Sequence, residues 1–204
     1  MLRDNHSIKL LDEAVEAFSS LPGVGRKSAL RLALHLLNQP RERVDRFVKS
    51  ISSLSKDIKY CPVCRMISDS GLCPFCGDKS RDSSIICVVE SIRDVLSIEN
   101  TSQYNGHYHI LGGIISPMDG VGPNDLPIKE LIDRIASGDV LEVVFALSTS
   151  MEGETTSFYL FKKLSQFPIK ITTIARGVGF GDELEYTDEL TLGRSILNRQ
   201  LFKP

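Results

Sequence analysis

Apolar positions three and four residues apart predict helices in the first quarter of the chain. Residues 8–20 (IKLLDEAVEAFSS) place apolar side chains at positions 8, 11, 15 and 18, which form one helical stripe. The breaker cluster LPGVG ends this helix, and a second helical stretch, ALRLALHLLN, opens after Arg26-Lys27-Ser28. A third periodic stretch covers residues 41–56. This part of the chain is therefore predicted to consist of three helices, the first two of which are separated by a tight turn.

From Ile85 onward the pattern changes, because short apolar runs alternate with longer amphipathic stretches. The strand-like runs are 85–89, 108–112, 140–147 and 169–175, and the helix-like stretches are 91–99, 127–137, 153–167 and 187–200. Such alternation is typical of a parallel sheet with helices on both faces.

Composition excludes several classes of protein. Of the 204 residues, 42% are hydrophobic and 25% are charged, which is ordinary for a globular chain and excludes wholesale disorder. No apolar run approaches the ~18 residues that a membrane span requires. The polar start MLRDNHSIK is unlike a secretory signal, so we expect a cytoplasmic location.

Charge is distributed unevenly along the chain. Residues 1–81 carry 14 Lys and Arg against 9 Asp and Glu, whereas residues 82–204 carry 10 against 17. A basic first part suits an anionic partner, and an acidic second part suits a cation or a basic protein. Chance variation among solvated faces is the alternative interpretation.

Four of the five cysteines form two CxxC knuckles, CPVC and CPFC, separated by eight residues. Such pairs present thiolates from tight turns, and a tetrahedral zinc ion needs four of these soft donors. Disulfides would suit an exported chain instead. Two knuckles within 16 residues leave no room for a hydrophobic core, so we expect a metal to replace it. The sequence predicts one structural zinc with no open position for catalysis, held by Cys61, Cys64, Cys73 and Cys76. Cys87 lies in an apolar run and is expected to be buried.

The segment LPGVGRKSALRLALHLL has the features of a backbone-binding turn. Gly23 and Gly25 precede a helix whose first turn is basic, and its N–H groups lie at the positive end of the helix dipole. Lys27 and Arg31 are four residues apart and share a helix face. The spacing of a nucleotide P-loop is absent, and a helix rather than a strand comes before the turn. The segment resembles a helix-hairpin-helix motif, which predicts DNA-backbone contacts from both glycines, Arg26, Lys27 and Arg31; a purely structural turn is the alternative.

Acidic residues gather where strands are expected to end. Glu90 closes the run ICVVE, and Glu152 and Glu154 follow VVFALS. The carboxyl ends of parallel strands form the crevice where ligands bind. The pattern resembles a Toprim domain, the metal-binding fold of topoisomerases and primases, in which an Asp-x-Asp pair holds Mg²⁺. Ser148 stands where the first of these carboxylates is expected, so we expect the three glutamates to bind a basic partner and Mg²⁺ only weakly. Solvated loop charges are the alternative.

The order of these parts resembles the RecR family of bacterial recombination mediators over essentially the whole chain. The resemblance is carried by LPGVGRKSALRLALHLL, CPVC, CPFC, ICVVES, YHILGGIISPMDGVGP, MEGETT and GVGFGDELEYTDELTLGRSIL. The departures are local: ALSTS replaces an Asn-containing strand end, and Arg176 and Gly179 stand where His and Pro are common.

The resemblance implies a multi-part α+β chain with a Toprim-like α/β domain built on a parallel sheet. The expected divisions are a helical domain with the helix-hairpin-helix (1–56), a four-cysteine zinc finger (57–81), the Toprim domain (82–178) and a C-terminal helical tail for oligomerisation (179–204).

The resemblance also implies a non-enzymatic DNA-binding protein of recombinational repair. Such proteins act with RecO, and in many bacteria RecF, to help load RecA onto single-stranded DNA coated by single-strand-binding protein. They form dimers and ring-like tetramers. The basic part would then face DNA, and the acidic crevice would receive a basic partner such as RecO. A Mg²⁺-dependent Toprim nuclease or primase is disfavoured by the missing Asp-x-Asp pair and nucleophile motif, and a zinc-ribbon module without DNA contact by the basic hairpin.

Overall fold

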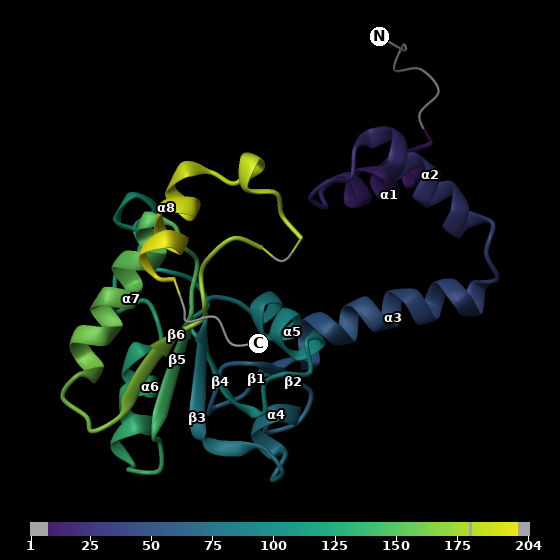
Figure 1. Cartoon of the computed structure of the whole chain (residues 1–204). Coiled ribbons are helices and arrows are strands. Elements are labelled where there is room, and N and C mark those ends of the chain that lie inside the picture. Colours follow the sequence, from purple (N-terminus) through teal and green to yellow (C-terminus); the bar gives the residue numbers. More distant parts are fainter. Residues whose placement is uncertain (1–7, 180, 200–204) are drawn as a thin grey trace. The chain divides into compact units, whose positions relative to one another are not determined.

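The computed structural model describes residues 8–179 and 181–199 (Figure 1). The chain divides into two units, residues 1–58 and residues 59–204. The first unit contains one hydrophobic cluster and the second unit contains two, so each unit has its own hydrophobic core. None of the helices in the described ranges combines the length and the apolar character that crossing a membrane requires.

The first unit contains the three predicted helices, namely α1 (Lys9–Ser19), α2 (Arg26–Leu37) and α3 (Arg41–Asp57). Helices α1 and α2 form a hairpin around a small core of Val15, Ala29 and Ala33. The two alanines lie four residues apart on α2 and allow the helices to approach closely. The turn between the helices contains Gly23 with φ of +79°, a backbone conformation that residues with a Cβ rarely adopt.

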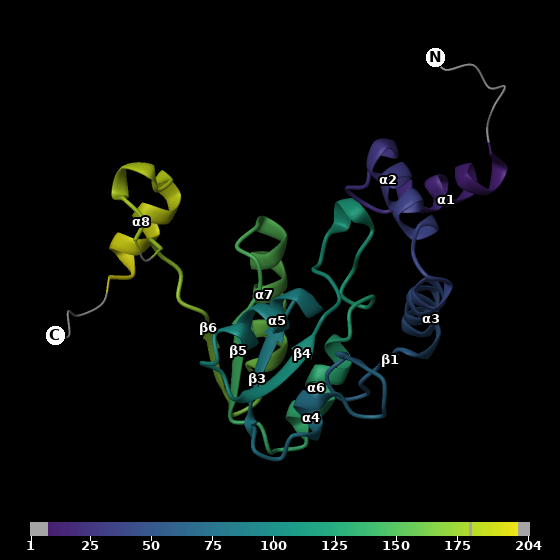
Figure 2. The ribbon, with the colours of Figure 1, turned by 90° about the vertical axis from the view of Figure 1, so that its right-hand side faces the viewer.

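A four-stranded parallel sheet forms the centre of the second unit, in the order β4-β3-β5-β6 (Figure 2). Its strands are β3 (Asp82–Val89), β4 (Gly106–Ile110), β5 (Glu142–Ala146) and β6 (Lys170–Thr173). The prediction of a parallel sheet is confirmed. Strand β3 begins three residues earlier than its apolar run, because its polar first residues still pair across an irregular register. The other strands differ from the predicted ranges by one or two residues at each end.

One face of the sheet is covered by two helices, as Figure 1 shows. Ile86 and Val88 of β3 belong to the same buried cluster as Leu131 and Leu160. These leucines come from α6 (Ile128–Ala136) and α7 (Met151–Leu164). The period of two along the strand therefore directs every second side chain of β3 toward these helices.

The opposite face is covered by α5 (Ile92–Asn100) and by the four-cysteine segment. Cys87, which is buried as predicted, lies in this second cluster with Val89, Tyr108 and Val95. Three of the knuckle cysteines belong to the same cluster. The prediction of helices on both faces is therefore confirmed, but the knuckles add to the cover of one face. The expectation that they have no hydrophobic core is wrong, because they share the core of the sheet.

A polar network centred on Arg81 and Glu99 connects the four-cysteine segment to α5 and to the sheet. The Arg81 guanidinium donates to the Glu99 carboxylate at 2.9 Å and lies 4.8 Å from the centre of the Phe75 ring. The Tyr108 hydroxyl donates to the same carboxylate at 2.6 Å. The network joins residues from α4 (Pro74–Gly77), α5 and β4.

The C-terminal part of the described chain continues from β6 into a short 3₁₀ turn, Leu184–Tyr186, and helix α8 (Glu189–Leu197). The Asp188 carboxylate caps α8 by accepting from the Thr191 N–H at 2.9 Å. The predicted helix 187–200 is therefore present, although its predicted last residue lies outside the described ranges. A further 3₁₀ turn, Pro117–Asp119, lies in the loop between β4 and α6.

Candidate functional site

The two knuckles are built by short, tight backbone turns. The first lies between β1 (Lys59–Tyr60) and β2 (Ile67–Ser68), which pair antiparallel. The Arg65 N–H donates to the Cys61 carbonyl at 2.9 Å, and the left-handed conformation of Arg65 closes the turn. The second knuckle opens α4, where the Cys76 N–H donates to the Cys73 sulfur at 3.4 Å.

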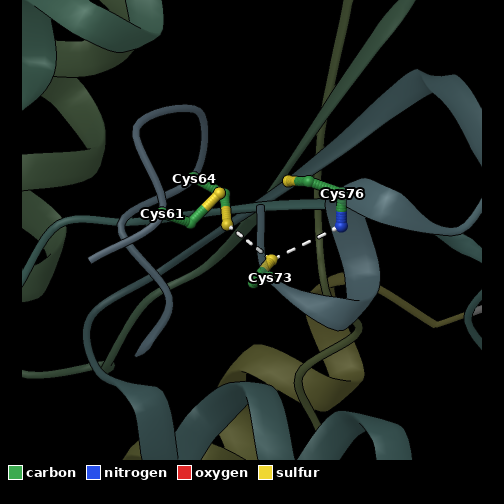
Figure 3. Close-up of side chains that lie close together, drawn as sticks. All are labelled: Cys61, Cys64, Cys73 and Cys76. Atoms are coloured by element: carbon green, nitrogen blue, oxygen red, sulfur yellow. Dashed lines mark hydrogen bonds between the residues drawn. The ribbon is translucent and has the colours of Figure 1, made fainter. Parts of the chain in front are cut away.

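The four knuckle cysteines turn their sulfur atoms toward one another (Figure 3). Their sulfur atoms all lie within 4.8 Å of one another, and those of Cys64 and Cys73 are 3.3 Å apart. A tetrahedral zinc with bonds of about 2.3 Å separates its sulfur ligands by about 3.8 Å, so the cluster has the right size. Within the described ranges it is the only group of three or more potential metal-binding side chains that converges in this way.

The thiols oppose joint ionisation without a cation. A hydrogen bond with the Cys76 thiol and burial raise the pKa of Cys64, and burial raises the pKa of Cys73 to about 11. Burial also acts to raise the pKa of Cys61, but backbone N–H groups outweigh it and lower that pKa to about 7. All five cysteines lie in the described ranges, and none of them forms a disulfide there. Four converging soft donors with no open position fit a structural zinc ion, which stabilises the thiolates by its charge.

The helical hairpin presents the predicted basic residues to solvent. Gly25 is the N-cap of α2, with no side-chain capping bond and no acidic residue in the first turn. Arg26, Lys27 and Arg31 are all exposed, whereas Ala29, on the face opposite to Lys27 and Arg31, is fully buried against α1. The N-terminal end of α2 therefore combines a positive dipole end with three cationic side chains.

Glu90 follows β3 directly and is half-buried. It lines a pocket of about 850 Å³ at the carboxyl ends of β3 and β4 together with Arg65, Arg93, Asp119 and Asp125. Burial raises the pKa of Glu90, and a nearby carboxylate, that of Asp94, adds to the effect. No sequence pattern associates these four residues with Glu90, because three of them lie in a knuckle turn and in the loop before α6, where the chain has no periodic signal.

Glu152 and Glu154 lie in the first turn of α7 rather than in a loop. This turn packs so closely on the preceding segment that a Cβ on Gly153 would clash with the Ser148 carbonyl oxygen. Glu152 is exposed, whereas Glu154 forms an ion pair with Arg176. Arg176 stands out in the sequence only as a family departure, and no local signal pairs it with Glu154.

The three predicted glutamates lie in different surroundings. Glu90 and Glu154 line separate pockets, and the latter pocket also contains Arg176 and Arg194. The three glutamates do not form a converging ligand group within the described part of the chain. The arrangement can offer separate acidic contacts, and it does not present three carboxylates to one ion.

Family models match the chain in four consecutive segments. They describe the helix-hairpin-helix of RecR (residues 11–54), the four-cysteine zinc finger domain of RecR (residues 58–78), a Toprim domain (residues 84–175) and the C-terminal part of RecR (residues 177–200). The cysteine cluster lies within the second segment, and the helical hairpin and the parallel sheet begin two residues before the first and third segments, respectively.

Similar proteins cover nearly the full chain. A protein named Recombination protein RecR from Porphyromonas gingivalis is 58% identical over 95% of this chain and 94% of its own length. Proteins of the same name from Bacteroides thetaiotaomicron and Flavobacterium johnsoniae are 56% and 52% identical, over 95% and 97% of this chain and 94% and 96% of their own lengths. The chain therefore belongs to the RecR family of recombination proteins, as its sequence motifs predict.

Proposed function

We propose that this chain is a non-enzymatic DNA-binding mediator of recombinational repair. It acts with RecO, and with RecF where that protein is present, to help load RecA onto single-stranded DNA coated by single-strand-binding protein. The observation that carries the DNA-binding part is the uncapped N-terminal end of α2 with its exposed Arg26, Lys27 and Arg31. Contacts of this kind bind phosphates and do not read bases.

The absence of catalysis is supported by the surroundings of the glutamates. Arg176 pairs with Glu154 and competes there with a metal ion, and Ser148 offers a hydroxyl where a carboxylate would hold Mg²⁺. A Mg²⁺ ion in an enzyme of this class keeps several waters and depends strongly on its few carboxylates. Glu90 and Glu152 then act as acidic contacts for a basic partner, RecO, with Glu154 as a further contact.

Several copies of the chain assemble on DNA in this proposal. One chain offers few phosphate contacts, and several copies of the hairpin on one DNA would raise the overall affinity. The C-terminal segment 179–204 joins subunits into a dimer or a ring-like tetramer, and the chain divides functionally at residues 56, 81 and 178. The proposed place of action is the nucleoid in the cytoplasm.

Replacement of Lys27 or Arg31 by Ala tests the DNA interface. Each substitution should weaken binding to all sequences alike and should reduce the slope of log affinity against log salt by about 0.7 to 0.9. Mobility-shift titrations of the full chain at several salt concentrations measure both quantities, on single-stranded and on duplex DNA.

Lys129→Ala is the matched control, because it removes one exposed cation from α6 in the other unit and should leave the slope unchanged. Circular dichroism and sedimentation verify that each variant is folded and assembled. Unchanged affinity and slope in the Lys27→Ala Arg31→Ala double variant would overturn the DNA interface.

The same binding reactions with added Mg²⁺, followed by analysis of the DNA products, test whether the chain is an enzyme. Strand scission that disappears in Glu90→Ala would overturn the non-enzymatic role.

A further inference from the structure

The outer edge of β4 is closed by two different partners. The Ile110 N–H donates to the carbonyl of Cys64 at 2.9 Å, and the Tyr108 carbonyl accepts from Nη1 of Arg134 at 2.8 Å. Residues two apart on a strand direct their backbone groups to the same side and are about 6.6 Å apart. The guanidinium of Arg134, which comes from α6, therefore lies beside the first zinc knuckle along this edge.

Arg134 has no carboxylate partner among the described residues, although it is half-buried. Its second nitrogen, Nη2, lies 2.9 Å from Nδ1 of His107. Because a guanidinium only donates, Nδ1 accepts and the imidazole is neutral. Burial, followed by the charges of Arg134 and Arg81, lowers the pKa of His107. The lowered pKa favours the neutral imidazole.

The cysteine cluster becomes anionic when it binds zinc, and Arg134 lies beside its first knuckle along the edge of β4. Burial lowers the pKa of the Arg134 guanidinium, whereas the thiols of Cys76 and Cys64, followed by the Tyr104 hydroxyl and the Cys61 thiol, act in the opposite direction. Four thiolates around one zinc carry a net charge of −2, and a buried net charge is unfavourable unless an opposite charge lies nearby.

Two other arginines, both in the four-cysteine segment, are less suited to balance this charge. Arg81 is paired with Glu99, and Arg65 is exposed, so water screens its charge. We propose that Arg134 is the internal counter-cation of the zinc site, a positioning residue that favours zinc retention because its charge stabilises the thiolate ligands, without a bond to the metal.

Zinc retention in full-length variants tests this role. The variants are Arg134→Gln, which keeps a hydrogen-bond donor without the charge, and Arg134→Lys, which keeps the charge without the planar fork. Lys129→Gln is the control, because it removes an exposed cation from the same helix. The rate of zinc transfer to an excess of a chromogenic chelator is measured for each, and the absorption of the Co²⁺-substituted protein reports the geometry of the thiolate ligands.

We expect Arg134→Gln to release zinc at least tenfold faster, a factor that corresponds to about 1.4 kcal/mol. Arg134→Lys should stay within about threefold of the unmodified chain, and Lys129→Gln should match it. A folded Arg134→Gln variant with an unchanged release rate would overturn the proposal. If Arg134→Gln is not recovered folded, the zinc release rate of Arg134→Lys decides. A near-normal rate supports a role for the charge of Arg134. Tenfold faster release would show that the hydrogen bonds of the guanidinium matter and not its charge, and would overturn the proposal.

Discussion

His109 is the fully buried imidazole of β4. Its Nε2 donates to the Pro127 carbonyl at 2.8 Å, and its Nδ1 has no hydrogen-bond partner within the described ranges. Because a carbonyl only accepts, Nε2 carries a proton, and the buried Nδ1 has no acceptor there for a second one, so the ring is neutral. Burial lowers the pKa of His109 from 6.5 to about 4. The folded state therefore binds a proton at this ring less readily than the unfolded state does.

This difference makes the fold sensitive to acid. Above about pH 6.5 neither state protonates His109, so its full contribution is present; as the pH falls toward 4, the unfolded state gains a proton first and stability is lost. Between pH 7.5 and pH 5.0 the unmodified chain should lose about 2 kcal/mol more unfolding free energy than His109→Gln, which does not titrate. Denaturant titrations with excess zinc at both pH values measure the difference.

His35→Gln is the control, because it removes an exposed histidine of α2 and should keep the pH dependence of the unmodified chain. Parallel losses of stability in His109→Gln and in the unmodified chain would show that this imidazole is not the acid-sensitive group.

Contacts between side chains that are far apart in the chain could not be predicted from the sequence. The partners of Arg134 lie 26 and 27 residues away, and Glu154 and Arg176 are 22 residues apart. Hydrogen bonds and ion pairs over such separations leave no periodic trace, since any exposed charge at these positions fits the same pattern. The cysteine ligands could be predicted because tetrahedral zinc imposes a spacing on the chain itself.

At the scale of the elements, burial of one stripe or one face produces the signal that the sequence carries. Helix α6 buries Ile128, Leu131 and Ile135, and its predicted range was correct within one residue at each end. The ends are less predictable where capping decides them, as in α7, which starts at Met151 because Ser150 caps it. The contribution of the knuckles to the cover of the sheet could not be predicted, because sequence period identifies a buried face and not the partner that buries it.

The shared core makes the zinc site important to the sheet as well as to the knuckles. Cys64→Ala removes one ligand, and zinc binding supplies an apparent ~10–16 kcal/mol in zinc-finger peptides. We expect zinc content to fall well below one per chain and the thermal unfolding of the sheet to shift downward, because Val89 and Tyr108 pack in the same cluster. Elemental analysis and circular dichroism measure the two effects.

Cys87→Ala is the matched control, since it removes a buried thiol of this cluster that is not a zinc ligand and should keep one zinc per chain. A Cys64→Ala protein with a full complement of zinc, or with an unchanged unfolding temperature, would contradict this account.

The two units of the molecule carry surfaces of different charge, one basic and one acidic. The first unit carries the basic hairpin, and the second carries the exposed Glu152 and the half-buried Glu90. The charge asymmetry of the sequence predicts this separation, because the basic excess lies before the sheet and the acidic excess lies within it and after it. DNA binding and partner binding should therefore respond to different substitutions.

Glu152→Lys tests this independence. Reversal of an exposed charge places like charges opposite a basic partner, which costs several kcal/mol at an interface, so RecO affinity should fall at least tenfold. The affinity for DNA and its salt slope should be retained, because the hairpin is untouched. Surface plasmon resonance with RecO and mobility shifts with DNA measure the two interactions. Glu130→Lys, the same change at an exposed position of α6, should leave both intact. Equal losses of RecO binding in the two variants would indicate a nonspecific charge effect, and unchanged binding in Glu152→Lys would exclude this residue from the interface.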